Sequence, residues 1–581
     1  MTEFLTESEL EHAMAENFRI GDFPACAHAL WQLKNESSGH SWRIYLKKLL
    51  RAPELQGAKS ELFKEQYENL KKKEGSEQQI ANILSLGLLL LPKDRFLAFA
   101  MATLASKLKK PEWVEYALAP LGEPTENDVE LMNAHAALSV ERGDYSRALK
   151  LFERLYAQTQ GNIEIGKNVA TALVGLNRHD EARDLLEKLL VDDLKPLDTL
   201  TRLLNIEKRT GENVGAYLLN LEEKYLSSDG VSKNIEASVA IDIYLQRYQS
   251  AAEKLSQKTL ETKDPEQIFR LSELQLVTGD YLNALRNYSI RFTAFPELLL
   301  YETTAKPYQG EFLEEESLFV WMDQGIGEEL IFSYFLDEVA KRVRAVTVCC
   351  DGRLKNAFER KFDSITFLNR YENRQPPETD YACSGGDLFT LFLPEVLSGD
   401  IKLRYPGIWP STTATVQNED SEMPAQTTIA ISWRGGRGVS GRIRSLSLEK
   451  LLKPSEGLEN VRFISLQYDD KEEQDIESLG DERVLLSGID NKNDLEGVME
   501  VIGKCDAVLS IDNSVAHLGS MLCKPTAVVI PSGQTQWRWK NAHIRECLLP
   551  NTNTFIQQDP EKWDGAVAGA WEFLKRKFDL C

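Results

Sequence analysis

A period close to 34 residues runs through the first half of the chain. Segments such as RGDYSRALKLFERL at 142–155 and TGDYLNALRNY at 278–288 share one order, a turn with Gly, Asp or Asn followed by a helix that carries a small residue. These small residues are Ala148, Ala182, Ala216, Ala251 and Ala284, spaced by 34, 34, 35 and 33 residues. The common register predicts pairs of helices that stack side by side, with each alanine allowing close packing.

This period and pattern resemble the tetratricopeptide repeat. The resemblance implies a solenoid of helices over 131–300, whose groove would bind a peptide or protein. Residues 1–130 contain further amphipathic helices in looser register, and we interpret them as degenerate repeats or a helical cap.

The pattern changes near residue 300 to short apolar runs that alternate with amphipathic helices. A first series has such runs at 318–323, 345–351 and 364–370, and a second at 428–436, 461–469, 483–488, 507–512 and 525–531. A stretch rich in Ser, Thr, Pro and Gln at 410–428 separates them and is predicted to be a linker. Apolar strands alternating with helices predict a parallel sheet covered on both faces. We therefore predict two α/β lobes, 301–415 and 416–581, with a cleft between them and a final helix in the second lobe.

Composition and charge exclude several classes of function. The 581 residues carry a formal charge of −22, which does not favour nonspecific binding to nucleic acid or to an anionic membrane. The eight cysteines are scattered without metal-ligand spacing, as expected of reduced thiols. The longest apolar stretch, 83–91, is too short to span a bilayer, and the acidic N-terminus is not typical of a signal peptide. We expect a cytoplasmic protein with no membrane span and no nucleic-acid partner.

Polar side chains follow the predicted strand at 507–512, in the stretch SIDNSVAHLG. Ligands of open parallel sheets gather at the carboxyl ends of strands. Ser514 is predicted to cap the next helix, whose free amides with the helix dipole would then bind a phosphate. Asp512 and His517 would face the same ligand. In the alternative interpretation, Asp512 and Ser514 only cap the helix and His517 packs between strands.

Two other predicted strand ends carry groups that suit a phosphorylated ligand. The loop WRGGRGVSGRIRS at 433–445 gathers Arg434, Arg437, Arg442 and Arg444 among glycines, although the chain is acidic overall. Such a cluster favours a bound anion, unless the loop is simply a solvated basic segment. Gln467 follows the strand at 461–469, where it could hydrogen-bond a nucleobase or ribose.

The first lobe offers a glycine turn, DQGIGEELIF at 323–332, between a predicted strand and helix. It does not match G-x-G-x-x-G, so a dinucleotide fingerprint is not present there. Glu328 in the opening helical turn could act as general base for a hydroxyl. In the alternative interpretation, Glu328 and Glu329 only complement the helix dipole.

Taken in order, WMDQGIGEELIFSYFLDEV, IAISWRGGRGVSGRIRSLSLEKLL, FISLQY, DAVLSIDNSVAHLGSMLCKPTAVVIP and QWRW resemble bacterial glycosyltransferases of the GT-B fold. The chain is most similar to the heptosyltransferase-like group with N-terminal tetratricopeptide repeats, and more distantly to O-GlcNAc transferase. The similarity spans about 310–575 for the catalytic part and at least 130–290 for the repeats.

The resemblance implies an inverting, metal-independent transfer of a sugar from a nucleotide-diphospho-sugar. Arg434 and the neighbouring arginines, with Ser514 and the amides of Asn513–Val515, would grip the diphosphate, while Asp512, His517 and Gln467 would arrange the nucleotide. The family usually has aspartate after G-[LIM]-G as proposed base, whereas this chain has Glu328, a longer side chain.

We expect no cofactor and no metal site of the DxD kind, since Asp469–Asp470 begin a highly charged helix that we interpret as solvated. The repeats favour a protein acceptor, Ser or Thr of a cytosolic protein, with bacterial flagellin as a candidate by family analogy. A glycan acceptor, or a noncatalytic repeat scaffold with a nucleotide-binding lobe, is the alternative. Residues 537–539 either flank the nucleobase or pack under the final helix. The sequence leaves the oligomeric state, the sugar and the nucleotide open.

Overall fold

The structure is a computed structural model of the chain, and it describes residues 63–64, 67–68, 70–71, 77–210, 214–228, 231–232, 234–403, 426–436, 438–469, 471–559 and 562–580. The predicted helices before residue 63 and residues 410–425 of the predicted linker lie outside the described residues. The chain divides into two compact units, Met1–Leu189 and Leu190–Cys581, and each is described by itself. Among the described residues, no helix combines the length and apolar character needed to cross a membrane.

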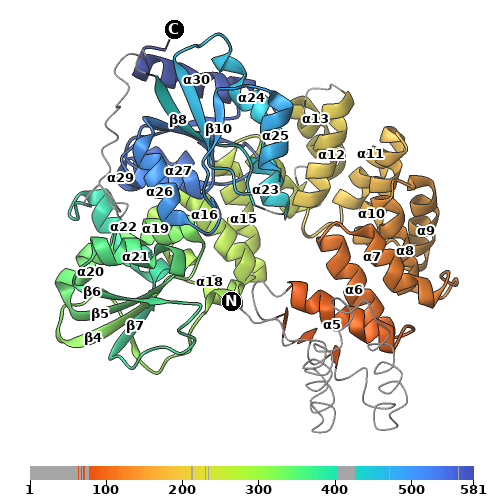
Figure 1. The fold of residues 1–581 in the computed structure, drawn as a ribbon, viewed down its shortest axis with the longest axis horizontal. Coiled ribbons are helices and arrows are strands. Elements are labelled where there is room, and N and C mark those ends of the chain that lie inside the picture. Colours follow the sequence, from red (N-terminus) through yellow and green to blue (C-terminus); the bar gives the residue numbers. More distant parts are fainter. Residues whose placement is uncertain are drawn as a thin grey trace, which may run out of the picture. The chain divides into compact units, whose positions relative to one another are not determined.

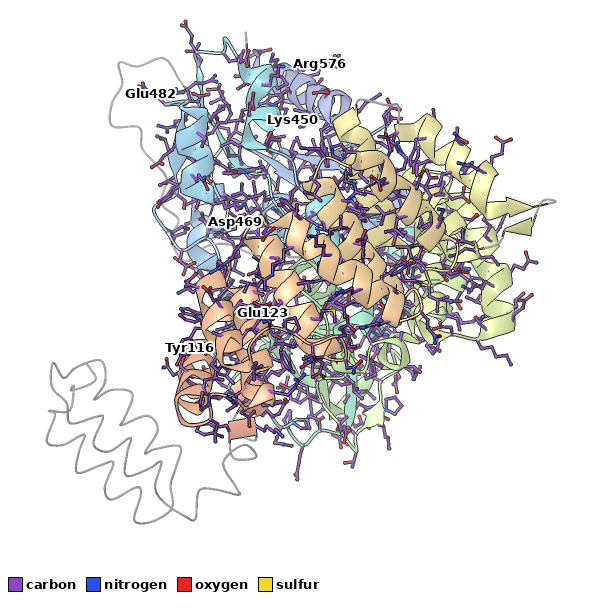
Figure 2. All side chains as sticks on the ribbon, turned by 90° about the vertical axis from the view of Figure 1, so that its right-hand side faces the viewer. Tyr116, Glu123, Lys450, Asp469, Glu482 and Arg576 are labelled. Atoms are coloured by element: carbon purple, nitrogen blue, oxygen red, sulfur yellow. The ribbon has the colours of Figure 1, made fainter. Side chains whose placement is uncertain are left out.

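The first unit is helical, as the repeat predicts. Its described helices are α5 (Glu77–Leu90), α6 (Arg95–Lys107), α7 (Pro111–Leu118), α8 (Val129–Glu141), α9 (Tyr145–Gln158), α10 (Ile163–Gly175) and α11 (His179–Leu190, which ends one residue into the second unit). Successive helices pack against each other, and Ala148 and Ala182 are fully buried. Asp144 caps α9 by accepting a hydrogen bond from the Arg147 amide. Figure 2 labels Glu123, which accepts hydrogen bonds from the Arg147 guanidinium.

The second unit begins with further repeat helices. These are α12 (Leu197–Thr210), α13 (Val214–Leu221), α14 (Ile235–Tyr244), α15 (Tyr248–Thr262), α16 (Pro265–Thr278) and α17 (Tyr281–Tyr288), followed by the short α18 (Arg291–Ala294). Ala251 and Ala284 are buried as predicted. Ala216 is exposed, so its predicted packing role is wrong. The short α13 runs into a π-helix and buries Val214 and Leu218 instead, so the regular spacing does not hold there.

The first lobe holds a parallel sheet of five strands in the order β3-β7-β4-β5-β6. Its strands are β3 (Lys306–Pro307), β4 (Leu313–Trp321), β5 (Val343–Cys350), β6 (Ile365–Asn369) and β7 (Tyr381–Ser384). Its helices are α19 (Ile326–Ser333), α20 (Leu336–Arg342), α21 (Gly352–Lys361) and α22 (Gly385–Ser398). The sequence predicted β4, β5 and β6 and missed the short β3 and β7.

The second lobe holds six parallel strands in the order β10-β9-β8-β11-β12-β13. Figure 1 labels β8 and β10 of this sheet. They are β8 (Thr427–Ser432), β9 (Val461–Ser465), β10 (Val484–Leu486), β11 (Ala507–Ile511), β12 (Thr526–Ile530) and β13 (Thr552–Ile556). The accompanying helices are α23 (Gly438–Arg444), α24 (Leu448–Leu452), α25 (Glu472–Leu479), α26 (Leu495–Lys504), α27 (Ser514–Met521), α28 (Trp537–Lys540), α29 (Ala542–Leu548) and α30 (Asp564–Phe578). The predicted fold class, helical repeats followed by two parallel-sheet lobes, is confirmed.

The last repeats and both lobes share one apolar core. Phe389 of α22 packs on Tyr288 of α17, with ring centroids 5.4 Å apart, and on Trp537 of α28, at 5.1 Å. The fully buried Arg291 of α18 adds ion pairs to Asp323 at 2.8 Å and to Asp387 at 2.7 Å, both in the first lobe. These contacts fix the final repeats against the strand ends of the lobes.

Candidate functional site

The turn after β11 lies where the sequence predicted it, but the helix that follows is capped by a different residue from the one predicted. Asn513, not Ser514, caps α27, because the Asn513 Oδ1 accepts hydrogen bonds from the amides of Val515 at 3.0 Å and Ala516 at 3.4 Å. Ser514 is the first helical residue, so the predicted capping role is wrong. Since their own chain already satisfies these two amides, the helix N-terminus is less open to an anion than the sequence indicated.

Asp512 lies below the surface, at 2% exposure. The indole Nε1 of Trp539 donates a hydrogen bond to its Oδ1 at 2.5 Å, and Arg444 Nη1 donates to its Oδ2 at 3.2 Å. Burial opposes ionisation, but the charges of Arg538 and Arg444 outweigh it and hold the pKa of Asp512 below its ordinary value. Asp512 is therefore a buried anion that orients cationic and aromatic side chains around it.

His517 joins the two lobes. Its ring is 3% exposed and lies 4.7 Å from the ring of Trp539. Gly327 of α19 faces it so closely that a Cβ there would lie 2.7 Å from the His517 Cδ2 atom. Burial lowers the pKa of His517 to about 3, and the charge of Arg538 adds to this effect. The imidazole is thus neutral at ordinary pH, and its Nδ1 atom has no hydrogen-bond partner among the described residues.

The described arginines of the 433–445 loop, Arg434, Arg442 and Arg444, do not gather at one point. Arg444 contacts Asp512 as given above and lines a cavity. Arg434 instead forms an ion pair with Asp469, labelled in Figure 2, with its Nε 2.6 Å from Oδ2, and another with Asp475. Asp469 is therefore the partner of Arg434, and its side chain stays 27% exposed, so it is only partly solvated.

The remaining candidates from these strand ends are placed as follows. The Arg442 side chain is 62% exposed and lies 3.6 Å from Asp198 of α12. Arg437 and Asp470 lie outside the described residues. Gln467 is fully buried, and its Oε1 accepts hydrogen bonds from the amides of Trp433 at 3.1 Å and Arg434 at 2.9 Å. The Gln467 side chain therefore holds the end of β8 in place.

Glu328 is paired with Arg538, which the sequence analysis considered only as a flank of the nucleobase or as packing. Arg538 Nη2 donates to Glu328 Oε1, which joins α28 of the second lobe to α19 of the first. Trp537 and Trp539 on either side are buried, but Trp537 packs on Phe389 and Trp539 on His517, in a different part of the core from the final helix α30, so the predicted packing under that helix is wrong. The sequence analysis named residues 537–539 but did not foresee this ion pair, which depends on the packing of the two lobes. The neighbouring Glu329 is buried and accepts a hydrogen bond from the Asp351 amide at 2.9 Å.

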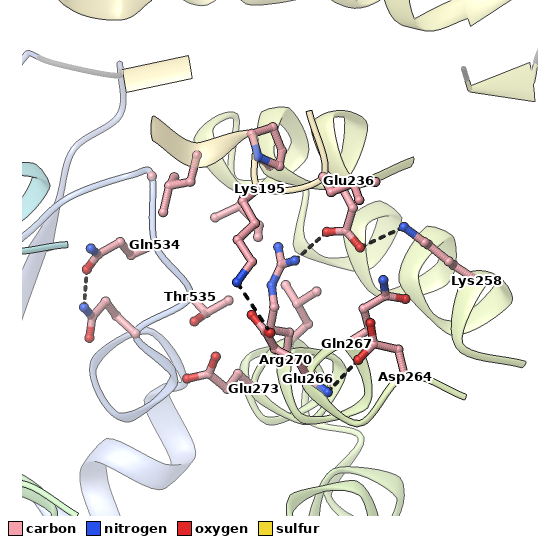
Figure 3. Close-up of a pocket in the computed structure, with 18 of the residues that line it drawn as sticks. Lys195, Glu236, Lys258, Asp264, Glu266, Gln267, Arg270, Glu273, Gln534 and Thr535 are labelled. Carbon is pink, nitrogen blue, oxygen red and sulfur yellow. Dashed lines mark hydrogen bonds and ion pairs between the residues drawn. The ribbon is translucent and has the colours of Figure 1, made fainter. Parts of the chain in front are cut away.

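A cavity of about 660 Å³ lies where the repeats meet the lobes (Figure 3). We call its two sides the lobe wall and the repeat wall. The lobe wall consists of Glu328, Arg444, 533–536 and Arg538. The repeat wall consists of 194–197, Glu236, Ala240, Ile243, Lys258, Asp264, Glu266, Gln267, Arg270, Glu273 and Leu274. Within the described part of the chain, no group of three His, Cys, Asp or Glu residues is placed to hold a metal ion.

Comparison with known proteins identifies the repeats directly. Residues 139–197 match the family model of the tetratricopeptide repeat, which confirms the predicted repeat class in that part of the chain. Protein FlbA of Caulobacter vibrioides is 23% identical over 530 residues, which cover 85% of this chain and 87% of FlbA.

Solved structures that match parts of this chain include three glycosyltransferases. A family 9 glycosyl transferase of Veillonella parvula is 10% identical and covers 47% of this chain and 100% of its own, with a TM-score of 0.31. The heptosyltransferase WaaC of E. coli is 11% identical and covers 40% and 98%, with a TM-score of 0.25. An O-GlcNAc transferase of Thermobaculum terrenum is 12% identical and covers 82% and 90%, with a TM-score of 0.24. At these TM-scores the likeness does not bear on the activity of this chain.

Proposed function

We propose that the protein is an inverting glycosyltransferase that moves a sugar from a nucleotide-diphospho-sugar to a hydroxyl without a metal ion. The observation that carries the proposal is the cavity in which Arg444 and Arg538 of the second lobe, Glu328 of the first lobe and the repeat helices meet. Two arginines beside Asp512, which follows the carboxyl end of β11, suit a phosphorylated ligand. The repeat helices beside them suit a second, larger substrate.

The arginines have a specific task in this proposal. Cleavage of a glycosyl–phosphate bond develops negative charge on the departing diphosphate. Arg444 and Arg538 already lie beside the buried Asp512 anion, so their charges are held in position before a ligand arrives. Asp512 and His517 then act as supports behind the donor site. Asn513, Ser514, Val515 and Gln467 remain predicted donor contacts.

The acceptor enters in this proposal from the repeat wall. A solenoid whose last helices line the cavity can bring the Ser or Thr of a cytoplasmic protein to the donor, and flagellin is one candidate. Glu328 is the predicted base from the first lobe, although one of its two carboxylate oxygens is engaged by Arg538.

The proposal is tested by incubating the purified protein with a panel of nucleotide sugars, with and without candidate acceptor proteins. Nucleotide release and an acceptor mass increase of one sugar are expected, unchanged by a chelator, with inverted anomeric configuration by NMR. Arg444→Ala should lower kcat/KM for the donor by about 100-fold or more. Arg576→Ala on the exposed face of α30 is the matched control and should leave it unchanged. Tight partner binding with no nucleotide release from any donor would instead support the scaffold.

A further inference from the structure

The cavity has five carboxylates on its walls, Glu236, Asp264, Glu266, Glu273 and Glu328. Four of them are engaged. Glu236 pairs with Lys258 at 3.0 Å and with Arg270, Glu266 faces Lys195 at 3.9 Å, and Glu328 pairs with Arg538. Asp264 accepts a hydrogen bond from the Glu266 amide at 2.9 Å.

Glu273 differs from these four groups. It has no hydrogen bond and no ion pair within 4 Å in the described part of the chain. Figure 3 shows its side chain extending from α16 toward the segment that carries Gln534 and Thr535 in the lobe wall. A carboxylate that faces a cavity without a protein partner is free to contact what enters that cavity.

The surroundings of Glu273 suit proton transfer. Burial raises the pKa of its carboxyl group, and the charge of Glu328 adds to this, against the opposing charges of Arg538 and Arg270. A general base works best when its pKa lies near the working pH. Because burial raises the pKa of this carboxyl group, Glu273 is a better base than a solvated carboxylate. The charges of Arg538 and Glu328 both act on Glu273, so Glu273 lies near this ion pair. The pair belongs to the lobe wall, on the proposed donor side of the cavity.

We propose that Glu273 of the repeat region, rather than Glu328, is the catalytic base that takes the proton of the acceptor hydroxyl. This inference rests on the proposed glycosyltransferase function. In the step, the hydroxyl O–H bond breaks and its proton goes to a Glu273 carboxylate oxygen. The hydroxyl oxygen forms the new bond to the anomeric carbon, and the bond from that carbon to the diphosphate breaks with its electron pair on the departing oxygen. Arg444 and Arg538 face the charge that develops there.

Glu328 has a different role in this arrangement. Its contact with Arg538 holds the guanidinium at the cavity, so Glu328 is a positioning residue. The repeats then supply a reacting group as well as a binding surface, so that only an acceptor seated on α16 would meet its base.

The test compares Glu273→Gln with the wild-type protein, using the donor and acceptor pair that gives turnover. We expect kcat to fall by at least about 100-fold, as for loss of a general base. The acidic limb of the kcat/KM profile against pH should disappear, because it reports the ionisation of the base. The melting temperature should stay the same or rise, since no ion pair is lost. Glu261→Gln, on the exposed face of the neighbouring α15, is the control and should keep full activity.

Other outcomes separate the two proposals. If the wild type releases no nucleotide from any donor, the proposed function itself fails. If the wild type is active and Glu273→Gln retains both its rate and its acidic limb, Glu273 is not the base although the enzyme class stands. Glu273→Asp keeps a carboxylate and should retain the acidic limb at reduced rate, and a total loss of soluble protein in both variants would assign Glu273 a structural role.

Discussion

The charged groups of the lobe wall act on one another, whereas most of those in the repeat wall are paired locally with their neighbours. In the lobes, Arg538 interacts with Glu328 and Asp512, and Arg444 contacts the same Asp512. In the repeats, Lys195 faces Glu266, and Glu236 pairs with Lys258 and Arg270. A coupled set of buried charges is sensitive to the loss of any member, while a set of separate pairs tolerates change. The lobe wall therefore suits a fixed ligand and the repeat wall a variable one.

Arg538→Met tests whether the charges of the lobe wall depend on one another, and we expect it to have the largest effect. It removes the cation that the buried Asp512 and the Glu328 carboxylate share, so we expect a loss of stability of about 3–5 kcal/mol. Chemical denaturation monitored by tryptophan fluorescence measures it. Arg576→Met is the matched control on an exposed helix, with an expected change within about 0.5 kcal/mol. Equal effects of the two substitutions would show that the lobe charges are not coupled.

Gly327→Ala tests how tightly the lobe wall is assembled. The new Cβ would lie 2.7 Å from the His517 Cδ2 atom and 2.8 Å from its Nε2, so one lobe has to shift against the other. We expect a loss of about 1–3 kcal/mol from overpacking, again by chemical denaturation. Gly565→Ala in α30, where nothing lies within 4 Å of the added Cβ, is the control and should be neutral or slightly stabilising. A neutral Gly327→Ala would mean that the lobes part easily.

The overall fold could be predicted from the sequence because period and strand alternation are local signals. The exposed Ala216 shows the limit of that reasoning, since a π-helix after α13 alters the packing where the spacing alone looked regular. Strands β3 and β7 were missed because they are too short to form a recognisable apolar run. Strand β13 was missed because its polar residues do not form such a run.

The site was predictable only in part. Strand ends pointed to Asp512, His517 and Arg444, because the carboxyl edge of a parallel sheet is where loops meet. The separation of Arg434 from Arg444 was not predictable, since it depends on Asp469 and Asp475 of another strand end and helix. Glu273 has no sequence signal, because a glutamate on a repeat helix looks the same whether it faces solvent or a cavity.

The pH dependence of the free energy of unfolding also tests the lobe side of the cavity, because His517 is buried where the two lobes meet. The folded protein holds its pKa at about 3, against about 6.5 in an unfolded chain. Between these values the unfolded state binds the extra proton, so stability falls as pH falls through this window. Denaturation at a series of pH values should show a smaller fall for His517→Gln than for the wild type. Identical slopes would mean that His517 takes up its proton in the folded state as well.

The smallest effect is expected at the rim of the repeat wall. Lys195 and Glu266 lie 3.9 Å apart with side chains 83% and 47% exposed, so solvent screens their attraction. A double-mutant cycle of Lys195→Ala and Glu266→Ala should give a coupling of about 0–1 kcal/mol that vanishes in high salt. The same cycle on Lys258 and the buried Glu236, which are 3.0 Å apart, is the internal comparison and should give a larger coupling. A strong, salt-resistant coupling at the rim would place Lys195 and Glu266 with the interdependent charges of the lobes. A weak coupling would mean that substitutions at the rim leave the charges of the lobe wall undisturbed, so the rim could vary with the proposed acceptor.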